Sequence, residues 1–219
     1  MLRPATCLYA ARALRDFGDG FVAILLVVYL TELGLGAFQV GIVAALALLG
    51  SALMTLGIGV FGALAGRRRL LIMASTLMVA TGLAFAASGS YAVLLLVAFI
   101  GTVNPSSGSV SIFVPLEHAL LADSVADSRR THMFAVYGLI GAVAAALGSL
   151  AAASPEYLVD VGLSRLEALK AMFLLYALLG VAGGIIYRLI PVDSSPAGKK
   201  PTSALGPSRS IVYRLATLF

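Results

Sequence analysis

Apolar residues follow one another in six long stretches, which short polar or charged turns separate. The stretches cover residues 17–35, 39–65, 70–88, 91–122, 132–153 and 168–190. A run of about 20 apolar residues is long enough for a helix to cross a bilayer. The stretches lack the alternation of polar and apolar residues that the wall of a membrane β-barrel needs. The pattern therefore predicts an all-α bundle of six transmembrane helices over residues 1–190.

Composition supports a lipid environment. Hydrophobic residues make up 60% of the 219 residues and charged residues only 11%, and the mean hydropathy is +1.02. Soluble domains contain fewer apolar and about twice as many charged residues. We therefore expect an integral membrane protein.

The distribution of basic residues predicts the orientation. With six spans, 13 of the 15 Lys and Arg residues fall on one side of the membrane, and only Arg165 and Lys170 fall on the other. Loops rich in Lys and Arg stay in the cytoplasm. We expect both termini to be cytoplasmic, in a bacterial-type cytoplasmic (inner) membrane. The same distribution explains the net charge of +5 without a nucleic-acid partner.

Residues 191–219 differ from the rest of the chain. They begin with Pro, Ser, Gly and Lys residues, which are typical of a flexible cytoplasmic linker. Residues 211–219 are apolar again but too few to span a bilayer. Arg214 and Phe219 repeat the spacing of Arg12 and Phe17 before the first stretch. We expect a linker that leads into a possible seventh span.

Residue types argue against several kinds of chemistry. Cys7 is the only cysteine, so no disulfide forms within the chain, and no metal-ligand spacing of Cys and His is present. His118 and His132 are the only histidines, and no Ser/His motif accompanies them. We expect no cofactor and no metal, and an intramembrane enzyme is the least favoured of the functions considered.

The fourth stretch carries the most polar residues. On a continuous helix, Asn104, Ser107, Ser111 and His118 fall within about 60° of one another. Such a stripe in a membrane helix faces a water-filled cavity or forms hydrogen bonds between helices. We predict these four residues as substrate-binding candidates.

Acidic residues inside the apolar stretches supply two further candidates. Asp19 lies between two glycines in the first stretch, where it could meet a cationic substrate or a proton, and we add it to the substrate-binding set. Glu117 lies about 100° from His118 around a helix and is a coupling candidate; the alternative is a carboxylate that snorkels or pairs with an arginine. Arg12 with Asp16 and Arg15 with Asp19 have the i,i+4 spacing of ion pairs.

The loop after the second stretch resembles the G-x-x-x-D-R-x-G-R-R/K signature of the major facilitator superfamily. The matching residues are Gly59, Gly66, Arg67 and Arg68. Ala63 and Leu64 replace the acidic residue and the first arginine of the signature. In that family the acidic residue belongs to a charge network that latches the cytoplasmic side. The resemblance implies that this latch is absent here or built from other residues.

A second resemblance covers residues 115–130, where Pro115, Asp123, Arg129 and Arg130 look like the end of the family's fourth span and its basic loop. By resemblance, the chain is the amino-terminal six-helix half, made of two inverted three-helix repeats. The first and fourth spans then line a central cavity.

Two classes of function follow from these expectations. The main hypothesis is a secondary transporter that moves a small solute by alternating access, proton-coupled or facilitative. Its partners would be the substrate, the lipid bilayer and either a missing carboxyl-terminal half or a second copy in a homodimer. The alternative is a six-span scaffold or pseudo-transporter that transports nothing.

Overall fold

The computed structural model describes residues 4–61, 66–103, 105, 111–124 and 129–190, and the secondary structure of this part is helical, without strands. The helices are α1 (Pro4–Glu32), α2 (Ala37–Phe61), α3 (Arg67–Ala87), α4 (Tyr91–Ile100), α5 (Phe113–Asp123), α6 (Arg130–Ala151), α7 (Ser154–Asp160) and α8 (Arg165–Leu189).

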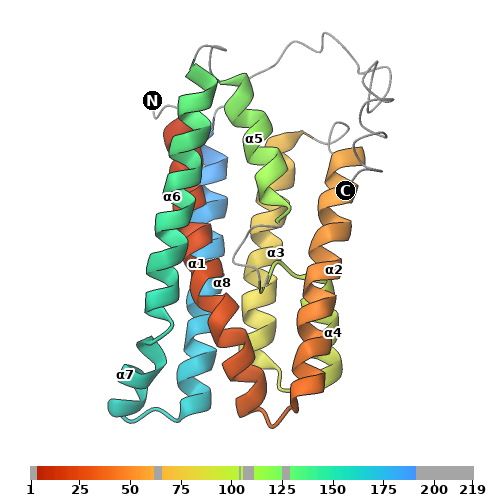
Figure 1. The fold of residues 1–219 in the computed structure, drawn as a ribbon, viewed down its shortest axis with the longest axis vertical. Coiled ribbons are helices and arrows are strands. Elements are labelled where there is room, and N and C mark those ends of the chain that lie inside the picture. The colour runs from red at the N-terminus through yellow and green to blue at the C-terminus, as the bar shows by residue number, and fades with distance from the viewer. Residues whose placement is uncertain (1–3, 62–65, 104, 106–110, 125–128, 191–219) are drawn as a thin grey trace.

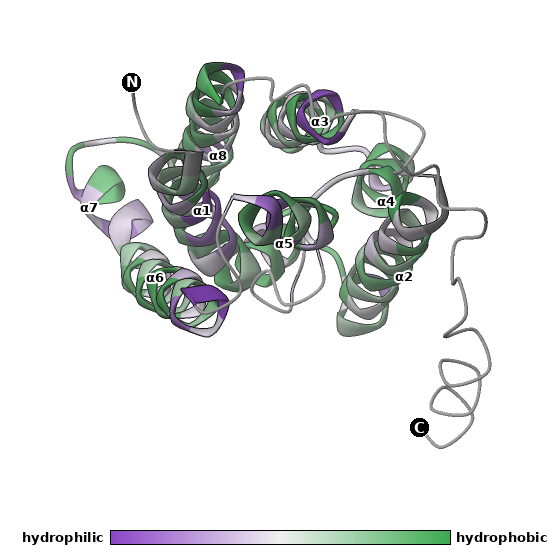
Figure 2. Ribbon diagram, turned by 90° about the horizontal axis from the view of Figure 1, so that it is seen from above, coloured by the Kyte–Doolittle hydropathy of each residue, from purple (hydrophilic) through white to green (hydrophobic). Residues whose placement is uncertain are grey.

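The long helices run side by side along the length of the molecule (Figure 1). Helix α4 lies towards the end of the bundle that holds α7, and α5 lies towards the opposite end. Seen from above, α3 and α8 form one edge of the bundle, α2 and α6 lie on the other side, and α5 lies between them (Figure 2). The described part therefore forms an all-α bundle, as predicted.

Four segments are long and apolar enough to cross a membrane: residues 37–59, 67–87, 130–160 and 165–189. Helix α1 has 29 residues but carries charged side chains in its middle. Helices α4 and α5 have only 10 and 11 residues. Helix α4 ends at Ile100 and residues 101–103 after it are not helical, so 91–122 is not one helix. The two further spans of the sequence analysis stay a prediction.

Helix ends follow from local sequence. Gly34, just after α1, has a φ of +82°, a conformation that glycine adopts without steric cost. Helix α8 begins with a capping box, in which the Ser164 side chain accepts a hydrogen bond from the Glu167 amide and the Glu167 side chain accepts one from the Ser164 amide. These signals place the connections between apolar segments at the ends of the bundle.

Glycines allow α1 and α6 to pack closely. A Cβ atom on Gly148 would lie 2.0 Å from the backbone oxygen of Phe17, and one on Gly20 would lie 2.3 Å from that of Ala145. No real Cβ atom approaches an oxygen so closely, so both positions require glycine. These close contacts hold α6 against the part of α1 that carries the charged side chains.

The contact between α2 and α4 is built in the same way. A Cβ atom on Gly50 would lie 1.8 Å from the backbone oxygen of Phe99. Small residues of this kind are typical of helix contacts in membranes, where close van der Waals packing replaces the hydrophobic effect. Gly50 and Gly148 thus each allow two helices to approach closely.

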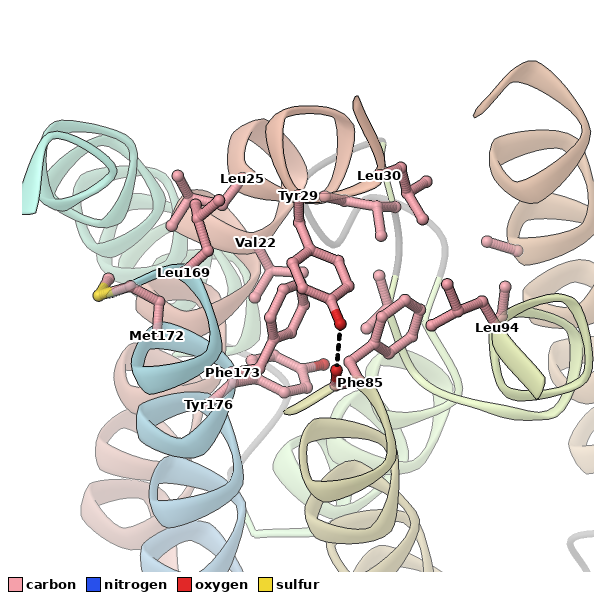
Figure 3. Packing of buried hydrophobic residues seen from close by; sticks show 14 of the residues in the cluster. Val22, Leu25, Tyr29, Leu30, Phe85, Leu94, Leu169, Met172, Phe173 and Tyr176 are labelled. Atoms are coloured by element: carbon pink, nitrogen blue, oxygen red, sulfur yellow. Dashed lines mark hydrogen bonds between the residues drawn. The ribbon is translucent and has the colours of Figure 1, made fainter. Parts of the chain in front are cut away.

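An aromatic core joins α1, α3 and α8 (Figure 3). Tyr29 is fully buried and donates hydrogen bonds to the backbone oxygens of Phe85, at 2.7 Å, and Ser88, at 3.1 Å. The rings of Phe85 and Phe173 stack with their centroids 5.1 Å apart. Satisfying the Tyr29 hydroxyl removes the cost of burying it. This core fixes α8 against α1 and thereby positions the polar residues that follow.

Candidate functional site

Four charged side chains are buried inside the bundle. Arg15, Asp16 and Asp19 of α1 and Glu117 of α5 have exposed fractions of 4%, 2%, 4% and 0%. We call these four residues, together with Arg12, the charged cluster. Ionised groups in a membrane bundle are costly unless they are paired or functional.

Arg15 and Glu117 form the centre of the charged cluster. Nη1 of Arg15 donates to Oε2 of Glu117 at 2.8 Å. The hydroxyl of Tyr137 in α6 donates to the same carboxylate oxygen, and that of Tyr187 in α8 donates to Oε1. The guanidinium of Arg15 also lies over the ring of Phe113, 4.7 Å from its centroid. Four helices therefore meet at one carboxylate.

Arg12 and Asp16 form the second pair. Nε of Arg12 lies 2.6 Å from Oδ2 of Asp16, which confirms the predicted i,i+4 pair. A Cβ atom on Gly141 of α6 would lie 2.4 Å from that oxygen, so the glycine makes room for the pair. Nη2 of Arg15 also contacts Asp16, at 3.3 Å. The predicted pair of Arg15 with Asp19 is wrong, because Arg15 instead contacts Asp16 and Glu117.

Asp19 has a different environment. The hydroxyl of Tyr176 in α8 donates to Oδ1 of Asp19 at 3.2 Å. The Tyr176 hydroxyl has a single proton, which lies in the bond to Asp19. The Thr102 hydroxyl is therefore the donor in its hydrogen bond to the Tyr176 oxygen, at 3.0 Å. The amide of Thr102 then donates to the hydroxyl oxygen of Thr81 at 3.3 Å. This chain of hydrogen bonds leads from the middle of α1 to the non-helical segment that follows α4.

The charges of the cluster do not balance. Three carboxylates accompany two arginines, so a fully ionised cluster carries one negative charge. Asp16 and Glu117 each contact an arginine. Among the described residues, Asp19 forms no ion pair and contacts only the neutral Tyr176 hydroxyl through a hydrogen bond. Asp19 is therefore the carboxyl group that can gain or lose a proton without leaving an arginine unpaired.

The remaining substrate-binding candidates lie in or near the fourth apolar stretch. His118 is exposed, whereas Glu117, which was expected to lie off the cavity face, is fully buried. The His118 ring meets those of Phe134 and Tyr137, with centroids 5.1 Å apart in each case. Ser111 is half-buried and precedes α5. A single helical stripe through Ser111 and His118 is wrong because α5 starts only at Phe113. Asn104 and Ser107 lie outside the described residues.

The loop residues lie at one end of the bundle. Gly59 lies in α2, Gly66 precedes α3, and Arg67 and Arg68 begin α3. The guanidinium of Arg67 forms an ion pair with Asp123, the last residue of α5. Basic residues at a helix N-terminus are unfavourable with respect to the helix dipole, so the contact with Asp123 offsets part of this cost.

Comparison with known proteins shows the family. A family model of the Major Facilitator Superfamily matches residues 8–216, nearly the whole chain. The chain belongs to this superfamily. It is also 28% identical over 191 residues to an uncharacterized membrane protein of Saccharomyces cerevisiae. The match covers 86% of the chain but 43% of the yeast protein, so the chain spans less than half the length of this relative.

Membership in the Major Facilitator Superfamily makes this chain part of a membrane transporter family rather than of a typical enzyme family. The departure from the superfamily's loop signature falls at Ala63 and Leu64, which lie outside the described residues. Arg67 matches the signature, and in this member it pairs with the carboxylate of Asp123 at the end of α5.

Sequence reasoning missed the tyrosines of this superfamily member. Tyr137, Tyr176 and Tyr187 donate hydrogen bonds to carboxylates of the charged cluster, but in the sequence each is surrounded by apolar residues. One signal was present: Tyr176 and Tyr187 are 11 residues apart, which is about three helical turns and the same helix face. Thr102 lacked any comparable signal.

Proposed function

We propose that the chain is the amino-terminal half of a secondary transporter that moves a small solute by alternating access. The observation that carries the proposal is the hydrogen-bond chain from Asp19 through Tyr176 to Thr102. It places a carboxylate without an arginine in the middle of a membrane protein, next to an interrupted span. Carboxylates in this position usually bind ions, protons or substrates.

The interruption between α4 and α5 supports a binding role for the first and fourth spans. Transporters of several folds bind their substrates where a membrane helix is broken, because unwound backbone offers free polar groups there. Thr102 and Ser111 flank this break in the described part of the chain. In the proposal, Asp19 binds a proton or a cationic group, and Asn104, Ser107, Ser111 and His118 contact the solute.

Glu117 has a different role in this proposal. Its carboxylate accepts hydrogen bonds from Arg15, Tyr137 and Tyr187 at once. Breaking any of these contacts leaves a buried polar group without its partner. We infer that coupling to a proton involves Asp19 first, and that Glu117 transmits the change by releasing Arg15.

Two glycine contacts support six spans arranged as two inverted three-helix repeats. In such a repeat, α1 corresponds to the span made of α4 and α5, and α2 corresponds to α6. The contact of Gly148 in α6 with the Phe17 oxygen of α1 then corresponds to that of Gly50 in α2 with the Phe99 oxygen of α4. Both contacts pair a glycine with a phenylalanine backbone oxygen.

The exposed apolar surface of α2 and α6 supports the proposal that another part of the protein or a second copy packs against it. Large apolar side chains are exposed along both helices, among them Leu53, Leu56, Leu139 and Leu150, with exposed fractions of 50% to 74%. The yeast relative is more than twice as long as the matched region. In the proposal, a carboxyl-terminal half or a second copy covers this face.

The proposal also includes the orientation in the membrane. The arginine-rich end of the bundle is cytoplasmic, and both termini lie on that side of a bacterial-type inner membrane.

Site-directed cysteine labelling tests the proposal on the full-length protein in membrane vesicles. Cys7 is buried, so a variant in which Cys7 and any other native cysteines are replaced provides a silent background. A cysteine at His118 should react with a membrane-impermeant maleimide, and the reaction rate should change with pH or with the transported solute. A cysteine at Leu178, on the exposed apolar face of α8, is the matched control and should stay unreactive. If His118→Cys stays unlabelled from both sides under every condition, the bundle is closed and the scaffold hypothesis is favoured.

A further inference from the structure

A shallow groove runs along the outer edge of the bundle, between α3 and α8. Its volume is about 210 Å³, and the residues that line it include Ser75, Thr76, Gly180, Gly184, Ile185 and Arg188. Figure 2 shows that α3 and α8 form the edge away from α2 and α6. No member of the charged cluster lines the groove. It is therefore a separate feature from the candidate transport site.

The floor of the groove is apolar, because its hydroxyl groups are already hydrogen-bonded within α3. Gly180 and Gly184 contribute no side chains, and a Cβ atom on Gly180 would already lie 3.1 Å from Met78 and Val79. The hydroxyls of Ser75 and Thr76 donate to backbone oxygens one turn earlier in α3, each at 3.0 Å. Because these hydroxyls are already satisfied, the groove offers a hydrocarbon-like surface that suits an acyl chain rather than a polar solute.

One end of the groove is strongly basic. Arg188 lies in the last turn of α8, is exposed and lines the groove. Arg68, in the first turn of α3, donates a hydrogen bond from Nη2 to the backbone oxygen of Arg188, so the two residues are adjacent. Arg69 next to it is exposed. In the described part of the chain, Arg67 pairs with Asp123, whereas Arg68, Arg69 and Arg188 form no ion pair.

This end therefore has unbalanced positive charge. The arginines of α3 also lie at the positive end of the α3 dipole, which adds to the attraction for an anion. Basic pockets between membrane helices on the cytoplasmic side commonly bind anionic lipid head groups.

We propose that the groove is a binding site for one acidic phospholipid. An acyl chain lies between α3 and α8 along Gly184 and Gly180, and the phosphate group contacts Arg188 and Arg68. The charge of the groove end selects acidic lipids over zwitterionic ones. This inference rests on the chain lying in a membrane and does not depend on transport.

The experiment is a lipid titration of the purified full-length protein, delipidated in detergent. Phosphatidylglycerol and phosphatidylcholine with identical acyl chains are added separately, and bound lipid is counted by native mass spectrometry while Tm is recorded. Phosphatidylglycerol should bind more tightly and raise Tm. In Arg188→Gln its affinity should fall about fivefold, the factor that corresponds to about 1 kcal/mol for one basic residue. Arg165→Gln, at the other end of α8, is the charge control and should bind like the wild type.

A second variant tests the acyl chain. Thr76→Phe fills the groove from an exposed position, so it leaves the α3–α8 contact intact and should abolish the preferred lipid site. Equal binding of both lipids, or no effect of Arg188→Gln and Thr76→Phe, would overturn the proposal. So would equally tight binding of glycerol phosphate without acyl chains, which would indicate a simple anion site. Cross-linking of Ile185→Cys to a second copy or to another part of the protein would show that protein covers the groove instead.

Discussion

Arg15 and Glu117 form an ion pair at 2.8 Å although they lie 102 residues apart in the chain, on α1 and α5. Both side chains are almost completely buried, and Tyr137 and Tyr187 satisfy the carboxylate further. The pair links the first helix to the second part of the interrupted fourth stretch. A rearrangement of α5 relative to α1 must therefore break or move this contact.

Removal of one partner of this pair should destabilise the protein strongly. Glu117→Gln leaves Arg15 without its main counter-charge, and Arg15→Met leaves Glu117 ionised and unpaired. Each change should cost about 3–5 kcal/mol, the range for breaking a buried pair. The double variant should cost much less than the sum, because no unpaired charge remains. Thermal unfolding of the purified full-length protein measures all three.

The exposed pair between Arg165 and Glu32, at 3.8 Å, is the control for that cycle. Glu32→Gln should change stability by about 0–1 kcal/mol, as surface pairs do. An effect of Glu117→Gln as small as that of Glu32→Gln would show that Glu117 is not ionised and paired in the bundle.

Asp19→Asn should leave folding nearly unchanged. An asparagine oxygen can still accept the hydrogen bond from Tyr176, and among the described residues no arginine loses an ion-pair partner. Because asparagine imitates a permanently protonated aspartate, solute exchange should persist while uptake driven by a pH gradient is lost. Proteoliposomes with and without a gradient separate the two activities once a solute is known.

Asp16→Asn is the matched control for this prediction. It removes a carboxylate that contacts both Arg12 and Arg15, so it should lower Tm where Asp19→Asn does not. Equal destabilisation by both changes would contradict the distinct role of Asp19.

Gly148→Ala should weaken the contact of α1 with α6. The added methyl group would lie 2.0 Å from the Phe17 oxygen, and the helices would have to separate. We expect a loss of about 1–3 kcal/mol, as overpacking typically costs. Gly50→Ala should behave alike at the contact of α2 with α4, since 1.8 Å separates its Cβ position from the Phe99 oxygen.

Gly138→Ala on α6 and Gly57→Ala on α2 provide the controls, because neither Cβ position has a neighbour within 4 Å. Both should be neutral or slightly stabilising, since alanine favours helix over glycine. Thermal unfolding of the four variants compares them directly; equal losses at all four positions would point to a general effect of removing glycine.

The Asp123 carboxylate should matter little for stability. Arg67 and Asp123 are 42% and 56% exposed as side chains, so Asp123→Asn should cost at most about 1 kcal/mol. A larger loss of Tm would mean that further residues join this pair in the full-length protein.

Local features could be predicted from the sequence because they depend on neighbours in the chain. The pair of Arg12 with Asp16 follows from i,i+4 geometry. The angle of about 100° between Glu117 and His118 separates the two side chains, but it does not tell which of them is buried. The resemblance to the superfamily, carried by short motifs around Arg67 and Arg68, is confirmed by the family model.

The sequence by itself determined that the chain is an all-α membrane protein, because long apolar stretches without alternation leave a helix as the element that satisfies its own backbone in lipid. Only the tertiary structure decided which charges meet. Asp19 lies one turn from Arg15 on the same helix, yet Arg15 pairs with Glu117. Close packing at Gly148 and Gly141 brings α6 and its Tyr137 to one side of α1. Helix α5 brings the fully buried carboxylate of Glu117 to the same place. Partners separated by 102 residues depend on how helices pack, and no local periodicity records that.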